Sequence, residues 1–107
     1  MDKIKIKDLE VFARHGVFPE ENFLGQKFVI SATLHTSTRK AGLTDELEYS
    51  IHYGEVSHLI KKIVEENTWK LLEKVAEELA RAILLEYPLA QQADIKIKKP
   101  WAPVGLP

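Results

Sequence analysis

One lysine near the end of the chain, Lys99, holds a position at which a side chain could do proton chemistry. In the stretch DIKIKKP, Ile95 and Ile97 share one face of an expected strand, while Lys96 and Lys98 share the other, because strand side chains alternate. Lys99 falls on the isoleucine side. An ammonium group there would be partly desolvated, which lowers the pKa of a lysine and suits it to general acid–base catalysis. The pattern alone leaves open a plain surface lysine at a frayed strand end.

Glu73 is a second candidate, because it lies in the first or second turn of an expected helix, beside Ala76 and Ala80. A fixed carboxylate there could accept two parallel N–H donors from the planar edge of a ligand. Acidic residues are also common in the first turn of a helix, where they stabilise the helix dipole without binding anything. Taken alone, the position favours this structural role.

Metal and thiol chemistry find little support in the sequence. The chain contains no cysteine, which excludes disulfides, thiolate nucleophiles and zinc–thiolate sites. The histidines show no metal-ligand spacing; they are His15, His35, His52 and His58. We therefore expect no metal site.

Two alternating segments in the first third of the chain predict an antiparallel pair of strands. The first alternates in one phase at Ile4 and Ile6 and in the other at Leu9 and Val11, as a β-bulge around Lys7–Asp8 would produce. The second alternates cleanly over residues 26–36. Its apolar face consists of Phe28, Ile30, Ala32 and Leu34. The segments 17–25 and 37–52 are expected to be loops, the second long and polar.

Two amphipathic helices are expected next, one on the apolar stripe of residues 56–64 and one from about Thr68 to Tyr87, where Pro88 ends it. The lysine-rich strand comes last. The order strand, strand, helix, helix, strand predicts an α+β fold, with an antiparallel sheet and two helices packed on one face. A three-stranded sheet and a wide apolar helix face both suggest burial against other subunits.

Composition indicates one ordinary folded domain over residues 1–107. The chain is 45% hydrophobic and 29% charged, with 15 basic and 16 acidic residues, a balance that argues against electrostatic binding of nucleic acid. No apolar run has transmembrane length, and the charged N-terminus is not a signal peptide. We expect a cytoplasmic protein with neither a nucleic-acid nor a membrane partner.

Five motifs in register resemble the dihydroneopterin aldolase family. HG, PEENFLGQKF, SIHYGEV, LLEKVAEELA and IKIKKPWAPV occur in that family's order and spacing, over about residues 4 to 104. Each motif alone is weak, but the set is specific. The resemblance implies the tunnelling fold (T-fold), in which subunits form ring-shaped tetramers that commonly stack into a homo-octamer, with active sites at subunit interfaces.

The reaction that the resemblance implies is a retro-aldol step of folate biosynthesis. 7,8-Dihydroneopterin is cleaved to 6-hydroxymethyl-7,8-dihydropterin and glycolaldehyde, and family members can also epimerise the substrate. A C=N bond of the dihydropterin ring accepts the electrons of the breaking bond, so no metal, Schiff base or cofactor is implied.

The resemblance also assigns roles to single residues. Lys99 corresponds to the catalytic lysine that handles a side-chain hydroxyl proton, and Glu21 to the glutamate near it. Tyr53 corresponds to a catalytic tyrosine that reaches in from a neighbouring subunit. Glu73, with the backbone around Leu72, corresponds to the group that binds the 2-amino and N3–H edge of the pterin. By the same resemblance, Ser50, Ile51 and His52 lie on the loop that carries Tyr53 and are expected to line the pocket. Gly25 and Gln26 belong to the motif with an expected structural role.

The sequence departs from the family in two places. His52 stands where many members carry asparagine. Family members also continue beyond this chain's last residue, Pro107, into a final strand, so we expect a domain that lacks this strand.

Two rival functions stay open. One is dihydroneopterin triphosphate epimerase, which has the same fold and which a basic cluster at the pocket mouth would favour. The other is a non-catalytic pterin-binding or assembly module of a larger folate enzyme. The joint presence of Glu21, Tyr53, Glu73 and Lys99 weighs against this second reading.

Overall fold

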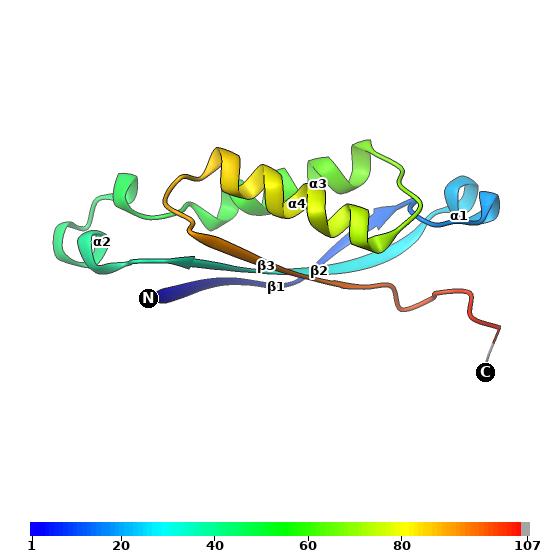
Figure 1. Cartoon of the computed structure of the whole chain (residues 1–107), viewed down its shortest axis with the longest axis horizontal. Coiled ribbons are helices and arrows are strands. Elements are labelled where there is room, and N and C mark those ends of the chain that lie inside the picture. The colour runs from blue at the N-terminus through cyan, green and yellow to red at the C-terminus, as the bar shows by residue number, and fades with distance from the viewer. Residues whose placement is uncertain (106–107) are drawn as a thin grey trace.

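The structure, a computed structural model, describes residues 1–105 as an antiparallel sheet of three strands with two long helices on one face (Figure 1). The strands are β1 (Asp2–Ala13), β2 (Gln26–Thr36) and β3 (Gln92–Lys98), in the order β1-β2-β3, so β2 lies in the centre. The long helices are α3 (Tyr53–Glu66) and α4 (Leu72–Glu86). The predicted α+β architecture is confirmed.

β1 carries the β-bulge that its change of phase predicts. Its pairing with β2 slips between Ile6 and Leu9, so that two residues of β1 lie opposite Ser31 alone. Asp8 adopts a φ of 56°, and its N–H donates to the Ser31 hydroxyl at 2.9 Å. The extra residue keeps the apolar side chains on both sides of the bulge on the face that the helices cover.

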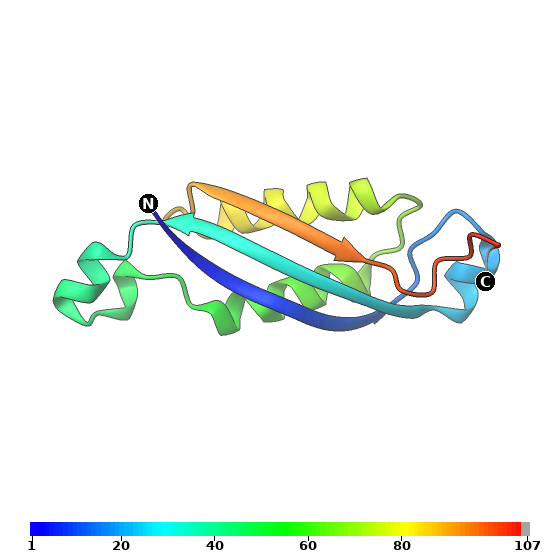
Figure 2. The ribbon, with the colours of Figure 1, turned by 90° about the horizontal axis from the view of Figure 1, so that it is seen from below.

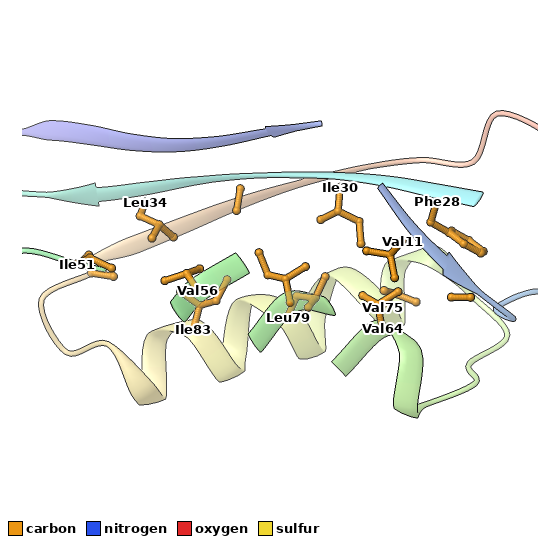
Figure 3. Close-up of a cluster of buried hydrophobic side chains, with 14 residues drawn as sticks. Val11, Phe28, Ile30, Leu34, Ile51, Val56, Val64, Val75, Leu79 and Ile83 are labelled. Atoms are coloured by element: carbon orange, nitrogen blue, oxygen red, sulfur yellow. The ribbon is translucent and has the colours of Figure 1, made fainter. Parts of the chain in front are cut away.

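The core lies between the sheet and the two long helices (Figure 3). The alternation of β2 is complete, and its apolar face is fully buried: Phe28, Ile30, Ala32 and Leu34. The helices contribute the matching stripes Val56, Ile60 and Val64 from α3 and Val75, Leu79 and Ile83 from α4. Burying each of the larger side chains contributes roughly 1.5–3 kcal/mol. The other face of the sheet is uncovered, as Figure 2 shows.

α4 begins at Leu72, four residues later than the predicted start near Thr68. The reason is that the backbone of Trp69 is bound elsewhere. Its N–H donates to Nδ1 of His15 at 3.0 Å, and its carbonyl accepts the N–H of Gly16 at 2.9 Å. The segment before α4 is therefore fixed to the end of β1 instead of continuing the helix.

Both segments predicted as loops contain short helices, so those predictions are wrong in part. α1 (Pro19–Leu24) lies between β1 and β2, and α2 (Arg39–Thr44) and the 3₁₀ helix η1 (Leu47–Tyr49) lie between β2 and α3. Pro19 occupies the first position of α1, and Gly25, with a φ of 72°, ends it. Two residues that are typical of loops here begin and end a short helix of six residues.

The molecule is elongated, with extents of 52 × 26 × 18 Å. α1 and the described C-terminal residues lie at one tip, while α2 and η1 lie at the other (Figure 1). Within residues 1–105, none of the helices combines the length and apolar character that crossing a membrane requires.

Candidate active site

Lys99 follows the last residue of β3, yet its side chain keeps the alternation of that strand. The side chain is 12% exposed, and its Nζ lies 5.9 Å from the centroid of the buried Phe28 ring. The strand does end before Lys99, as expected for a lysine at a strand end. Its side chain nevertheless points to the apolar side and is shielded, as expected for an acid–base residue. Its ammonium is surrounded mainly by protein atoms.

Glu21 is the partner of this lysine. Its side chain is 8% exposed, and its Oε2 accepts a hydrogen bond from Lys99 Nζ. The N–H of Phe18 donates to Oε1 at 3.3 Å, and Nε2 of Gln26 donates to Oε2 at 3.4 Å. Burial raises the pKa of Glu21, but these hydrogen bonds and the charge of Lys99 outweigh it, so the pKa is lowered from 4.5. Glu21 is thus a carboxylate at neutral pH, held by several donors.

Glu21 is placed by α1. Hydrogen bonds donated from α1 to the segment that follows β1, and from that segment to α1, hold this helix in place. The Asn22 side chain donates to the carbonyl of Arg14 at 2.7 Å and to that of Gly16 at 3.1 Å. In return, the Arg14 guanidinium donates to the carbonyl of Phe23. Gly16 also leaves room for the carboxylate, because a Cβ at this position would lie 2.5 Å from Cδ of Glu21.

A cavity of about 280 Å³ opens beside Glu21, and its lining includes Glu20, Glu21, Gln26 and Trp101 but not Lys99. Gln26 is 8% exposed, and its Oε1 has no hydrogen-bond partner within residues 1–105. Buried amide oxygens are normally satisfied. This spare acceptor next to Glu21 is shielded from solvent, so a ligand hydroxyl or a water molecule would reach it only after Gln26 moves.

His15 is buried between this pair and the start of α4. Its Nδ1 accepts from the N–H of Trp69, so the proton is on Nε2, which donates to the carbonyl of Val64 at 2.9 Å. The imidazole ring stacks on the Trp69 ring, with 5.6 Å between the ring centroids, and meets the Phe28 ring edge-on, with 5.4 Å between the centroids. Burial lowers the pKa of His15 from 6.5, the Val64 carbonyl opposes that shift, and the charge of Lys99 adds to it. The imidazole is therefore neutral and structural in its contacts.

Glu73 lies in the first turn of α4. This end of α4 points toward the tip of the molecule that carries α1 (Figure 1). Its side chain is exposed and has no hydrogen bond or ion pair with the residues that the structure describes. Leu72 is half-buried against the core. The backbone N–H groups of a first helical turn have no partner within the helix. In α4 the N–H of Lys74 donates to the carbonyl of Leu71 at 3.1 Å, so the groups available to a ligand are the Glu73 side chain and the N–H groups of Leu72 and Glu73.

The four remaining predicted site residues lie together at the opposite tip. Ser50, Ile51, His52 and Tyr53 line a second cavity, of about 450 Å³. His52 also caps α3, because its Nδ1 accepts the N–H of Glu55 at 3.1 Å. Tyr53 starts α3, and Val64, which contacts His15, lies eleven residues further along it, or about 16 Å at the usual rise of an α-helix. One chain does not bring Tyr53 to Lys99.

The sequence patterns gave no site role to His15 and only a structural one to Gln26. The sequence did contain an indication for His15. It follows Val11 and Ala13 in the alternation that marks the buried face of the first strand, and a buried histidine needs hydrogen-bond partners. The part of the chain that the structure describes contains no group of three or more histidine, aspartate or glutamate side chains placed to hold a metal ion.

Comparison with known proteins gives a consistent family similarity. The model of the family described as dihydroneopterin aldolase (FolB) matches residues 4–107. The curated dihydroneopterin aldolase of Bacillus subtilis (strain 168) is 42% identical over 104 residues, which are 97% of this chain and 87% of that protein.

Two solved structures agree with this similarity. A Vibrio cholerae chain assigned as a dihydroneopterin aldolase (FolB) superposes with a TM-score of 0.92 at 31% identity, over 99% of this chain and 89% of that one. The Escherichia coli dihydroneopterin aldolase, solved in complex with neopterin, superposes with a TM-score of 0.87 at 30% identity. The match covers 95% of this chain and 88% of that one. The similarity covers the sheet, both long helices and both tips.

Proposed function

This chain belongs to the dihydroneopterin aldolase family, and we propose that Lys99 and Glu21 carry out its reaction, the retro-aldol cleavage of 7,8-dihydroneopterin in the folate pathway. The observation that supports these roles is the nearly buried ion pair of the two residues, in which Glu21 also lines a cavity. The products are 6-hydroxymethyl-7,8-dihydropterin and glycolaldehyde.

The reaction needs proton transfers and orientation but no change of oxidation state overall. The hydroxyl on the second side-chain carbon loses its proton, and its oxygen becomes the carbonyl of glycolaldehyde. The bond between the first and second side-chain carbons breaks, and its electron pair moves into the C=N bond of the ring. The first carbon then takes a proton, which completes the hydroxymethyl group. The protein has to supply groups that accept and return protons at fixed positions.

The Lys99–Glu21 pair suits the removal of the hydroxyl proton. Both side chains are largely shielded from water, and the three donors around Glu21 fix its carboxylate. We assign the proton transfer to Lys99, which accepts the hydroxyl proton as a neutral amine after its ammonium has passed a proton to the Glu21 carboxylate or to solvent. We assign the positioning of substrate and lysine to Glu21.

Glu73 suits recognition of the pterin ring. The 2-amino group and N3–H of a pterin form a planar edge with two parallel donors, and a carboxylate accepts both. Among the described residues, Glu73 is exposed and unpaired at the tip that holds Lys99, and the backbone N–H groups of Leu72 and Glu73 beside it have no acceptor.

A second copy of the chain completes the site in this proposal. Tyr53 and its neighbours Ser50, Ile51 and His52 line a cavity at the far tip, so they reach the Lys99 tip only when another subunit presents them. Exposed apolar side chains at both tips support such an interface; they include Phe23, Leu24 and Trp101 at one tip and Leu43, Leu47 and Tyr53 at the other. A ring-shaped homo-oligomer supplies one such contact per subunit.

The cavity lining disfavours a triphosphate substrate. Among the described residues, the cavity beside Glu21 is lined by Glu20 and Glu21 and by no arginine or lysine. The nearby Lys27 is 3.6 Å from Glu10 and lies over the Trp101 ring. A neutral side chain fits this setting better than three phosphates, which supports the aldolase over the triphosphate epimerase.

The direct test is incubation of the purified protein with 7,8-dihydroneopterin and, separately, with its triphosphate, followed by chromatography. We expect hydroxymethyl-dihydropterin and glycolaldehyde in equal amounts from the first substrate. An epimer alone would move the protein to the epimerase branch. Neopterin binding without any conversion would leave the pterin-binding module as the function.

A further inference from the structure

His15 and Gly16 lie between the two groups of the site. On one side, Gly16 contacts the carboxylate of Glu21, where a Cβ would lie 2.5 Å from Cδ. On the other side, His15 accepts the N–H of Trp69, and Gly16 donates to the carbonyl of Trp69. Both backbone groups of Trp69 are thus bound by two consecutive residues at the end of β1.

Trp69 in turn fixes where α4 begins. Only Lys70 and Leu71 separate it from the first turn of the helix, which carries Glu73. A shift of Trp69 along either hydrogen bond therefore moves Glu73 relative to Glu21. The contact through His15 is the more sensitive of the two, because this side chain is 1% exposed and has no room for another rotamer between Trp69 and Phe28.

We propose that His15 is a positioning residue that sets the distance between the Lys99–Glu21 pair and the pterin-binding Glu73, through its acceptor bond to the N–H of Trp69. This inference rests on the proposed function of Glu73. Nε2 has a separate task, since its bond to the carbonyl of Val64 ties β1 to the end of α3 and contributes to stability. In this proposal Nδ1 positions the ligand-binding residue, and Nε2 stabilises the fold.

This division can be tested with two variants, because each keeps one nitrogen's role. Asparagine places an acceptor where Nδ1 stands, so His15→Asn keeps the bond to Trp69 and loses the one to Val64. Glutamine places a donor where Nε2 stands, so His15→Gln keeps the bond to Val64 and loses the one to Trp69. Glutamine is also closer to histidine in volume, so a pure packing role predicts that His15→Gln is the milder change in every assay.

We expect opposite rankings in stability and in binding. His15→Gln should be the more stable variant in urea unfolding, yet bind neopterin about tenfold more weakly than the wild type, as the loss of one buried hydrogen bond allows. His15→Asn should be less stable but bind neopterin within about threefold of the wild type. Hydrogen exchange of the Trp69 amide gives a readout without ligand, and only His15→Gln should accelerate it beyond its change in global stability.

Four results would count against these expectations. Equal loss of neopterin affinity in both variants, or a loss that follows stability, would overturn the positioning role. Fast exchange at Trp69 in His15→Gln with unchanged affinity would also overturn it, because the bond would then not control the ligand. A wild-type protein that does not bind neopterin would instead overturn the proposed function, and this inference with it.

Discussion

Lys99 reaches Glu21 because the alternation of β3 continues for one residue beyond the strand. The two lysines at this point face opposite ways. Lys98 is exposed on the open face of the sheet, 3.9 Å from Asp8, whereas Lys99 is 12% exposed on the core side. Lys98 and Lys99 are therefore neighbours of the same type in different environments, and Lys98 is a matched control for substitutions of Lys99.

We expect Lys99→Met to reduce turnover of 7,8-dihydroneopterin by at least about 100-fold, because a general acid–base group is lost. Neopterin affinity, measured by fluorescence titration, should stay near the wild-type value. The control is Lys98→Met, which removes the same charge from the outer face and should keep full activity. Turnover above one tenth of the wild type in Lys99→Met would remove the lysine from the chemistry.

We expect Glu73→Gln to weaken neopterin binding by roughly 10- to 100-fold, since hydrogen bonds to a charged group are lost. The turnover number at saturating substrate should change much less. Glu77→Gln is the matched control, because Glu77 is also exposed, one turn further along α4, and pairs with Arg81 at 3.8 Å. An unchanged affinity in Glu73→Gln would mean that the pterin edge is bound elsewhere.

The neutral state of His15 predicts a dependence of stability on pH. The folded protein holds the pKa of His15 below 6.5, so between 6.5 and the lowered value the unfolded chain binds a proton that the folded chain does not. The stabilisation is fully present above 6.5 and is lost as the pH falls through this window, at no more than about 1.4 kcal/mol per pH unit.

Urea unfolding at several pH values between about 7 and 5 checks this dependence. The difference in stability between wild type and His15→Asn should shrink as the pH falls. Glu21 does not interfere, because its pKa is lowered from 4.5 and its stabilisation is lost only at lower pH. A constant difference for His15→Asn would show that its protonation is not linked to folding.

At the scale of elements, long periodic segments were predictable and short ones were not. β2, the bulge in β1 and the two long helices follow from alternation and from 3.6-residue periodicity, because many buried residues repeat the signal. α1 and α2 have six residues each and no buried residue, so they leave no periodic pattern. The start of α4 was predicted too early because the backbone of Trp69 binds residues 15 and 16, more than fifty positions away.

The placement of α1 depends on the space at Gly16. We expect Gly16→Ala to push the Glu21 carboxylate away from Lys99 and to lower turnover by roughly tenfold to 100-fold, as small displacements of catalytic groups do. Gly42→Ala, in α2, is the control, because a Cβ there meets no atom within 4 Å. It should leave turnover unchanged. Full activity of Gly16→Ala in a steady-state assay would show that Glu21 adapts without cost.

At the scale of the whole molecule, the candidate site is divided between two tips. The sequence motifs identified residues of both groups through their family resemblance, and that family is confirmed. Periodicity in a single chain could not show that Tyr53 and Lys99 lie at opposite tips, because the separation arises from the length of α3 and from the direction of the strands. The roles of the single residues stay predictions.

A shared site predicts that two inactive variants restore each other. Lys99→Met and Tyr53→Phe should each be nearly inactive, but equal amounts refolded together should regain roughly a quarter of the wild-type activity, because random assembly gives that share of intact sites. Lys99→Met refolded with Glu21→Gln is the control. Both changes lie at the same tip, so every site stays defective. No recovery in the first mixture would contradict a site formed between Tyr53 of one copy and Lys99 of another.

The separation of the two tips has a consequence for how activity responds to dilution. A chain that carries one half of a site at each end is inert when alone, however well it is folded. Below the dissociation constant of the oligomer, specific activity should therefore fall while the folded fraction stays constant. In a cell, the number of working sites would then rise more steeply than the number of chains, so modest changes in abundance would have a disproportionate effect on flux.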